Sequence, residues 1–144
     1  MEIYLYTSDF VLIYENGQLM MKGSMKNQLP EGYWEAYHEN GQLWEEVMYK
    51  NGKQNGRYVC FYDNGQLEKE GIAKNDKADG RFVWYHKNGQ LYVEANFKDG
   101  VTIGNYDLYN KSGDKIKNND EFVANFREKE KRDFYNKKCK IMII

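Results

Sequence analysis

Two histidines are the side chains in this sequence best suited to acid–base or metal chemistry. His38 and His86 lie 48 residues apart and occupy equivalent positions in a repeated pattern. A zinc site needs further ligands near each histidine, and the strand spacing of a sheet would hold the two rings roughly 19 Å apart. Neither histidine stands near a serine or cysteine that would mark a nucleophile with its base. We therefore predict packed histidines, no catalytic residue, no metal site and no cofactor.

The remaining chemistry-bearing features restrict the class of protein. Cys60 and Cys139 are far apart and lack metal-ligand spacing, so we expect two reduced, structural thiols. The start of the sequence does not resemble a signal peptide, and no apolar run reaches membrane-spanning length. The net charge is −1, and the mildly basic C-terminal segment is too weakly charged to indicate nucleic-acid binding. These features predict a cytoplasmic protein with no nucleic-acid partner and no membrane insertion.

A repeated tetrapeptide determines the elements that must position these side chains. Asn-Gly-Gln-Leu begins at Asn16, Asn40, Asn64 and Asn88, always 24 residues apart. Spacing without drift indicates one small structural unit stacked on itself. Positions within a unit are counted here from this Asn, taken as zero. The fifth register reads Ser112-Gly113, so a fifth unit begins and then decays.

Each unit is expected to be a β-hairpin. Asn-Gly favours a two-residue type I′ turn, which would fix the register so that position −6 faces +7 and −3 faces +4. Position −6 is always aromatic, whereas +7 is small. Together with −4 and the Leu at +3, these positions predict one apolar core face. Units one and three also differ from units two and four, which indicates duplication of a 48-residue pair.

The predicted fold is all-β: an elongated, twisted antiparallel sheet of stacked β-hairpin repeats with a short C-terminal helix and an apolar tail. Isolated hairpins are marginally stable, so burial must come from stacking. We predict a repeat domain over residues 1–116, with four units and a decayed fifth, and a capping helix and tail over residues 117–144. Phe122, Phe126 and Phe134 lie on or near one face of that helix. The tail either packs on the last hairpin or associates with another copy.

The face opposite the predicted core carries aromatic and acidic residues from the second unit onward, whereas the first unit has Ile13, Met20 and Lys22 at the same positions. Either these rings simply cover the second side of the sheet, or they present an aromatic–acidic stripe to a partner. Glutamates in such a stripe would favour a partner with a basic surface. The residues predicted to bind the partner are Tyr37, Trp44, Glu46, Phe61, Glu70, Tyr85, Tyr92 and Glu94.

The units also resemble a known repeat family. Gly32–Leu43, Gly56–Leu67 and Gly80–Leu91 each run from a glycine through aromatic residues to Asn-Gly-Gln-Leu, and this pattern is similar to the MORN-repeat variant family. The resemblance extends over residues 10–113. It implies a sheet of stacked hairpins that serves as an interaction scaffold, and many bacterial relatives are labelled as antitoxin or immunity-type proteins. It brings no catalytic motif.

The leading hypothesis is therefore a non-catalytic protein-binding scaffold, an antitoxin or immunity-like protein that binds a partner, such as a toxin with a basic surface, through the aromatic–acidic face. Two alternatives remain. One is a repeat module that binds choline or glycans in aromatic cages. The other is a structural assembly scaffold in which the C-terminal segment pairs chains.

Overall fold

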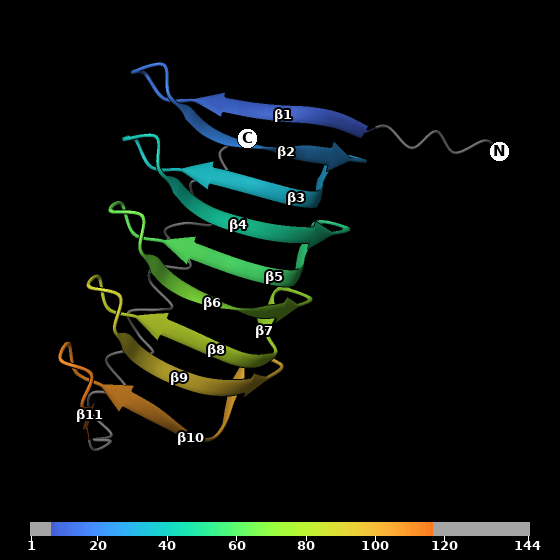
Figure 1. The fold of residues 1–144 in the computed structure, drawn as a ribbon. Coiled ribbons are helices and arrows are strands. Elements are labelled where there is room, and N and C mark those ends of the chain that lie inside the picture. The colour runs from blue at the N-terminus through green and yellow to red at the C-terminus, as the bar shows by residue number, and fades with distance from the viewer. Residues whose placement is uncertain (1–6, 117–144) are drawn as a thin grey trace.

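The computed structural model describes residues 7–116, and in this range all regular structure belongs to one antiparallel sheet of eleven strands (Figure 1). The strands follow one another across the sheet in chain order, except that the short β7 pairs only with β6. This confirms the all-β prediction of stacked hairpins. The predicted C-terminal helix and tail lie outside the described residues, and the domain boundary near residue 116 stays a prediction. The strands are β1 Thr7–Ile13, β2 Leu19–Lys26, β3 Leu29–Tyr37, β4 Leu43–Lys50, β5 Lys53–Phe61, β6 Leu67–Lys74, β7 Lys77–Ala78, β8 Gly80–Tyr85, β9 Leu91–Lys98, β10 Val101–Tyr109 and β11 Lys115–Ile116.

The Asn-Gly turns differ from the predicted type I′ geometry. In the first unit the Gly17 amide donates to the Tyr14 carbonyl at 2.9 Å, and the Tyr14 amide donates to the Gln18 carbonyl at 2.8 Å. Gly17 has a φ of +87°, whereas Asn16 keeps a negative φ. This is a three-residue loop in which a type I turn is followed by a left-handed glycine. Asn is selected here for its side chain, whose Oδ1 accepts the Gln18 amide at 3.0 Å.

Type I′ turns do occur, but at the opposite ends of the strands, in the loops that join one unit to the next (Figure 1). Asn51 and Gly52, between β4 and β5, have φ values of 51° and 79°. Two consecutive positive φ values are the signature of this turn, which suits the right-handed twist of neighbouring strands. The equivalent pairs are Asn27-Gln28, Asn75-Asp76 and Asp99-Gly100.

The three-residue loop shifts the register by one residue, and a β-bulge in the following strand restores it. Tyr37 therefore pairs with Leu43 at +3, while Ala36 pairs with Glu45 at +5. Trp44, at +4, is the extra residue of the bulge. The predicted pairing of −6 with +7 is confirmed in all four units: Phe10 with Gly23, Trp34 with Val47, Tyr58 with Gly71 and Phe82 with Ala95. The predicted pairing of −3 with +4 is wrong because it omits both the loop residue and the bulge.

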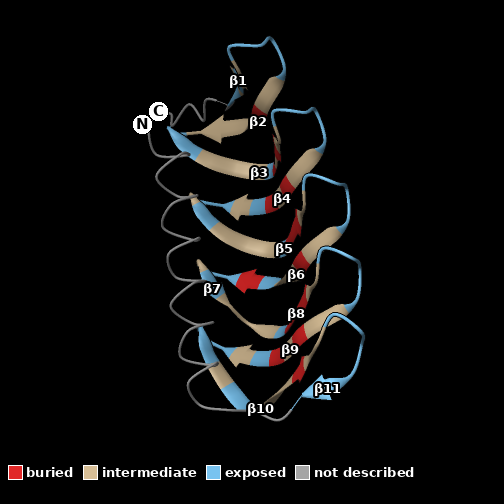
Figure 2. Ribbon diagram, turned by 90° about the vertical axis from the view of Figure 1, so that its left-hand side faces the viewer, coloured by how far each residue is buried: buried red, intermediate tan, exposed pale blue. Residues whose placement is uncertain are grey.

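One side of the sheet, called the core face below, carries two clusters of buried side chains, and the buried positions form a band across the strands (Figure 2). Directly opposed residues share a face, so each Leu at +3 lies with position −3 on the other side. The prediction that this Leu marks the core face is therefore wrong. The clusters are Met21, Trp34 and Ala36 in one, and Val47, Tyr58, Cys60, Phe82, Trp84, Val93, Ala95 and Leu108 in the other.

Packing on the core face explains the 48-residue doublet. A Cβ placed on Gly23 would lie 2.1 Å from the ring of Trp34, and one placed on Gly71 would lie 2.4 Å from the ring of Phe82. In both cases the ring belongs to the next unit. At the intervening junctions the same position holds a side chain, Val47 or Ala95, and both are buried. Along the stack, junctions in which an aromatic ring covers a glycine of the preceding unit thus alternate with junctions in which that position holds Val or Ala.

Candidate interaction surface

The other side of the sheet, called the open face below, consists of three rows of side chains that run across the strands. The middle row contains positions −5 and +6, which oppose one another directly from strand to strand. Neighbours in this row are roughly 4.8 Å apart, the spacing of paired strands. From β3 to β10 it reads Glu35, Glu46, Val59, Glu70, Val83, Glu94 and Asp107.

Apolar and aromatic residues form one flanking row, and the other mixes large apolar side chains with Arg57, Arg81 and Asn96. On the side of the Asn-Gly turns, position −3 pairs with the Leu at +3 in each complete unit. These pairs are Ile13 with Leu19, Tyr37 with Leu43, Phe61 with Leu67 and Tyr85 with Leu91. On the far side, positions −7 and +8 give the pairs Tyr33 with Met48, Arg57 with Ile72 and Arg81 with Asn96.

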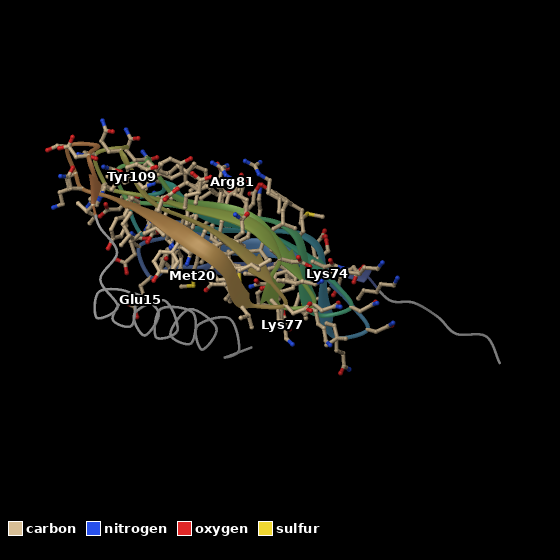
Figure 3. All side chains as sticks on the ribbon, turned by 90° about the horizontal axis from the view of Figure 1, so that it is seen from below. Glu15, Met20, Lys74, Lys77, Arg81 and Tyr109 are labelled. Atoms are coloured by element: carbon tan, nitrogen blue, oxygen red, sulfur yellow. The ribbon has the colours of Figure 1, made fainter. Side chains whose placement is uncertain are left out.

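The structure brings six of the eight predicted binding residues together on the open face: Tyr37, Glu46, Phe61, Glu70, Tyr85 and Glu94. Trp44 and Tyr92 are the exceptions, because the bulge at +4 turns these side chains to the core face, where they pack against the buried clusters. Figure 3 shows the same reversal in the first unit, with Met20 on the side of the sheet opposite Arg81 and Tyr109. On the core face the Trp44 ring lies 5.7 Å from His38, and the Tyr92 ring lies 4.3 Å from His86.

Most carboxylates of the middle row already have a cationic partner on the same face. The closest contacts join Arg81 to Glu94 and Lys115 to Asp107, each at 2.7 Å. Lys22 lies 3.3 Å from Glu35, and Arg57 lies 3.6 Å from Glu70. Each cation lies on the strand next to its carboxylate, either directly opposite it or diagonally across. The ion pairs therefore cannot be recognised from the sequence of one strand alone. The acidic stripe is therefore largely neutralised within the chain.

The pair Glu35 and Glu46 is only partly neutralised, because Lys22 contacts Glu35 whereas no described cation forms an ion pair with Glu46. The two carboxylates oppose each other directly on β3 and β4, an arrangement that destabilises a sheet unless it is compensated. The Tyr37 hydroxyl donates to Glu35, and this bond, with help from Lys22, lowers the pKa of the carboxyl group. Burial, followed by the same hydrogen bond, raises the pKa of Tyr37 from 10.0 to about 12. Burial and the neighbouring Glu46 likewise raise the pKa of Tyr33.

Large apolar side chains are exposed along the far row of the open face. Tyr33 and Ile72 are each 46% exposed, and Ile103, which pairs with Asn96, is 52% exposed. In the middle row beside them, Val59 and Val83 are only 2% and 1% exposed, so exposure differs sharply between neighbouring rows of the same face. The sequence analysis missed this row. The sequence did contain the information needed to predict this row. Positions −7, −5 and −3 are two residues apart along each strand, so their side chains lie on the same face of the sheet.

The two histidines connect consecutive units through hydrogen bonds to backbone carbonyls. His38 Nε2 lies 2.9 Å from the Phe61 carbonyl, and His86 Nε2 lies 2.8 Å from the Tyr109 carbonyl. Tyr14 and Tyr62 bind the equivalent carbonyls through their hydroxyls, each at 2.7 Å. The Asn of each turn adds a second bond, from Nδ2 to the carbonyl at −1 of the next unit. Every complete unit therefore donates two hydrogen bonds to its successor.

No large pocket accompanies these surfaces in the described part of the chain. The cavity bounded by Trp34, Glu45 and Tyr49 on the core face has a volume of about 20 Å³, enough for roughly one water molecule. Within residues 7–116 no group of three or more His, Cys, Asp or Glu side chains could hold a metal ion. The same residues contain no helix that is long and apolar enough to cross a membrane. The open face, with its exposed apolar side chains, is the candidate interaction surface.

Comparison with protein-family models places the repeats in a known group. The model described as MORN repeat variant matches residues 10–27, 30–51, 54–75 and 78–99. Each matched segment contains one Asn-Gly hairpin and ends on the first left-handed residue of a type I′ turn, at Asn27, Asn51, Asn75 or Asp99. A comparison with curated proteins gave no significant match.

Proposed function

This chain belongs to the MORN repeat variant family, and we propose that it is a non-catalytic scaffold that binds another protein through its open face. The family matches cover more than half of the chain. MORN repeats generally serve as modules that bind proteins or membranes. The open face supports a protein partner, because it combines exposed apolar side chains with hydrogen-bonding groups across several units.

The far row carries this proposal. Tyr33, Met48 and Ile72 are large, at least one third exposed, and placed on three different strands of one rigid sheet. Arg57 on β5 separates Met48 from Ile72, so the row presents exposed apolar side chains around a basic one. Exposed apolar side chains mark interaction sites, and tyrosine is among the residues that most often anchor them. Val59 and Val83 in the neighbouring row are buried, whereas each of these three side chains keeps at least one third of its surface exposed and available to a partner.

At a finer level we propose an antitoxin or immunity-like role in the cytoplasm, with a toxin as the partner. The neutralised carboxylates contribute little attraction for a basic surface, so any basic contact should concentrate at Glu35 and Glu46. Among the described residues, Lys22 pairs with Glu35, and no cation forms an ion pair with Glu46. A basic side chain of the partner placed there would relieve the repulsion between the two carboxylates.

Co-expression with the toxin-like product of a neighbouring gene tests this function. We expect wild type to restore growth and to co-purify with the toxin, and the variant Tyr33→Ser/Met48→Ser/Ile72→Ser to fail in both assays. The matched control is Lys50→Ser/Lys74→Ser/Lys98→Ser, on the type I′ turn edge, which should behave as wild type. Circular dichroism establishes that both variants fold. Equal rescue by wild type and the apolar-row variant would refute the open face as the binding surface.

A second variant separates charge from apolar contact. Glu46→Gln removes the like-charge repulsion with Glu35, so the free protein should be no less stable than wild type. Binding should weaken, chiefly through a slower association rate that becomes less sensitive to salt. Unchanged association kinetics would remove the basic contact from the proposal while leaving the apolar row intact.

The alternative of a choline- or glycan-binding module is less well supported. Such modules need an aromatic cage that is open to a small ligand. The best candidates for cage residues, Trp44 and Tyr92, pack beside histidines on the core face, and the nearby cavity is too small for a sugar ring. The assembly-scaffold alternative depends on the C-terminal segment, which lies outside the described residues.

A further inference from the structure

The chain contains six Asn-Gly dipeptides, and they are not equally protected by the fold. They begin at residues 16, 40, 51, 55, 64 and 88. Asn-Gly is chemically labile, because glycine has no side chain to hinder attack of its backbone nitrogen on the preceding Asn side chain. We propose that Asn51 is a site of spontaneous deamidation, selected by the structure from these six.

Four of the six dipeptides are protected by the hydrogen bonds that join consecutive units. In the third unit, Asn64 Nδ2 donates to the Lys87 carbonyl at 3.1 Å, and Asn64 Oδ1 accepts the Gln66 amide at 3.0 Å. The Gly65 amide, which would be the nucleophile, donates to the Tyr62 carbonyl at 3.0 Å. Reaction requires all three bonds to open, and the other turns, at Asn16, Asn40 and Asn88, have the same three bonds.

Asn55 is protected in a different way. It lies inside β5, between strands β4 and β6, and is half-buried. The next residue, Gly56, pairs with Ala73 on β6. Bringing the Gly56 nitrogen against the Asn55 side chain would distort the middle of the sheet, where opening is rare.

Asn51 has neither form of protection. It is exposed at the tip of the β4–β5 turn, and within the described residues its side-chain amide forms no hydrogen bond. Its backbone amide donates to Glu31 Oε2 at 2.7 Å, which leaves the side chain free to rotate. One bond restrains the nucleophile, from the Gly52 amide to the Pro30 carbonyl at 3.1 Å. The reaction at Asn51 therefore requires this one hydrogen bond to open, whereas the reaction at Asn64 requires three.

The chemistry is self-contained. The Gly52 nitrogen loses its proton and forms a bond to Asn51 Cγ, while the bond from Cγ to Nδ2 breaks and ammonia leaves. Water then opens the resulting succinimide at either carbonyl, which gives aspartate or isoaspartate. The overall reaction consumes one water, releases one ammonia and adds one negative charge.

The surroundings indicate how the fold would respond to each product. Lys50 and Lys53 flank this turn directly opposite each other, and the Glu31 carboxylate accepts the Asn51 backbone amide, so a new carboxylate would enter a site with charges of both signs. The equivalent turn in the fourth unit already carries Asp, at Asp99-Gly100, with nearly the same φ values. The aspartate product should therefore keep the turn. The isoaspartate product inserts an extra backbone atom and should disrupt it.

Mass spectrometry of the aged protein tests this assignment. Folded protein is incubated at mildly alkaline pH and digested, and the mass increase from amide to acid is followed at all six sites. We expect Asn51 to react first, more than about tenfold faster than any of the four turn asparagines. The chain unfolded in denaturant is the matched control, in which the six sites should react at similar rates. The variant Asn51→Asp should abolish the early product without changing the unfolding midpoint by more than a small amount.

Two results would overturn the proposal. One is a turn asparagine or Asn55 reacting in the folded protein as fast as Asn51. The other is the same rate order in folded and unfolded chain, which would show that local sequence alone selects the site.

Discussion

At the scale of single residues, position −2 shows how a repeat can vary without losing its function in the fold. Tyr and His differ in size and charge, yet both place a donor on the carbonyl at −3 of the following unit, as Tyr14 and His38 do. The requirement at this position is therefore a ring with a polar hydrogen at its far end. A sequence pattern of Tyr, His, Tyr, His does not reveal that requirement until the acceptor is seen.

Substitutions at His38 separate the ring from its hydrogen bond. His38→Tyr should leave the free energy of unfolding nearly unchanged, because the hydroxyl can donate to the Phe61 carbonyl. His38→Phe keeps a ring beside Trp44 but loses the donor, and should cost about 1 kcal/mol. Equilibrium denaturation in urea measures both. Equal loss in the two variants would mean that the ring contact, and not the hydrogen bond, determines stability here.

The small residue at +7 is required in alternate units only. Gly71→Ala would place a methyl group 2.4 Å from the Phe82 ring, so we expect a loss of about 1–3 kcal/mol from overpacking. Ala95→Gly, the reverse change at an equivalent site, should cost about 1 kcal/mol through lost burial and greater freedom of the unfolded chain. The double variant Gly71→Ala/Phe82→Leu should recover part of the loss, and thermal unfolding would compare all three. Additive losses in the double variant would contradict the proposed clash.

At the scale of elements, the sequence predicted the strands and most of their pairing, and failed where a turn and a bulge compensate each other. The pattern of ring at −6 and small residue at +7 gave the correct register, since the three-residue loop and the extra residue at +4 cancel. Near the turn they have not yet cancelled, so Leu43 and Trp44 were placed on the wrong faces. The dipeptide Asn-Gly alone does not distinguish the type I′ turn from the three-residue loop. In the type I′ turn Asn contributes a left-handed backbone conformation, as at Asn51, whereas in the three-residue loop its side chain accepts a backbone hydrogen bond, as at Asn16.

The candidate site was predictable to a similar degree. Period and alternation placed Tyr37, Phe61 and the three glutamates on one face. The cations that neutralise Glu70 and Glu94 lie on neighbouring strands. These ion pairs could be predicted only with the exact pairing register of the two strands. The exposed fraction of each side chain was not predictable from the sequence. Val59 and Ile72 are both β-branched apolar residues on the open face, yet they are 2% and 46% exposed.

Strands β3 and β4 give the protein a predictable response to alkaline pH. Burial raises the pKa of Tyr37, helped by Glu35, and that of Tyr49, each from 10.0 to about 12. A raised pKa means that the folded state holds the proton more tightly than the unfolded state. The resulting stabilisation is complete below pH 10.0 and should be lost as the pH rises through about 12.

Urea unfolding at a series of alkaline pH values, with phenolate absorbance followed in parallel, measures this loss. Tyr37→Phe should reduce the pH dependence, and its effect should be largest in that same window. A constant unfolding midpoint up to pH about 12 would show that neither hydroxyl is as protected as the structure indicates.

At the scale of the whole molecule, the natural building block is the 48-residue pair. Inserting a copy of residues 50–97 after Phe97 keeps the alternation of the two junction types, because its one new junction places Tyr58 after Ala95, and the chain already has a tyrosine after Val47 and after Ala95. Stability and the denaturant m-value should therefore both rise. Inserting a copy of residues 74–97 at the same place would make Phe82 follow Ala95 of the preceding unit, whereas in the chain Phe82 follows Gly71 of the preceding unit. This shorter insertion should give a less stable protein than the longer one. Equal stability per added residue would show that the doublet has no packing consequence.

The last unit changes the meaning of the whole array. Asn110 stands where earlier units have Tyr or His, and its Oδ1 accepts the amides of Ser112 and Asp114 within its own turn. Ser112 likewise replaces the Asn that would reach forward. The donors at positions −2 and 0 point from each of the four complete units to the next, so the stack has a direction. The variant Asn110→Tyr/Ser112→Asn would give the fifth unit the same two forward-pointing donors, so that a further unit placed after it could be bound in the same way.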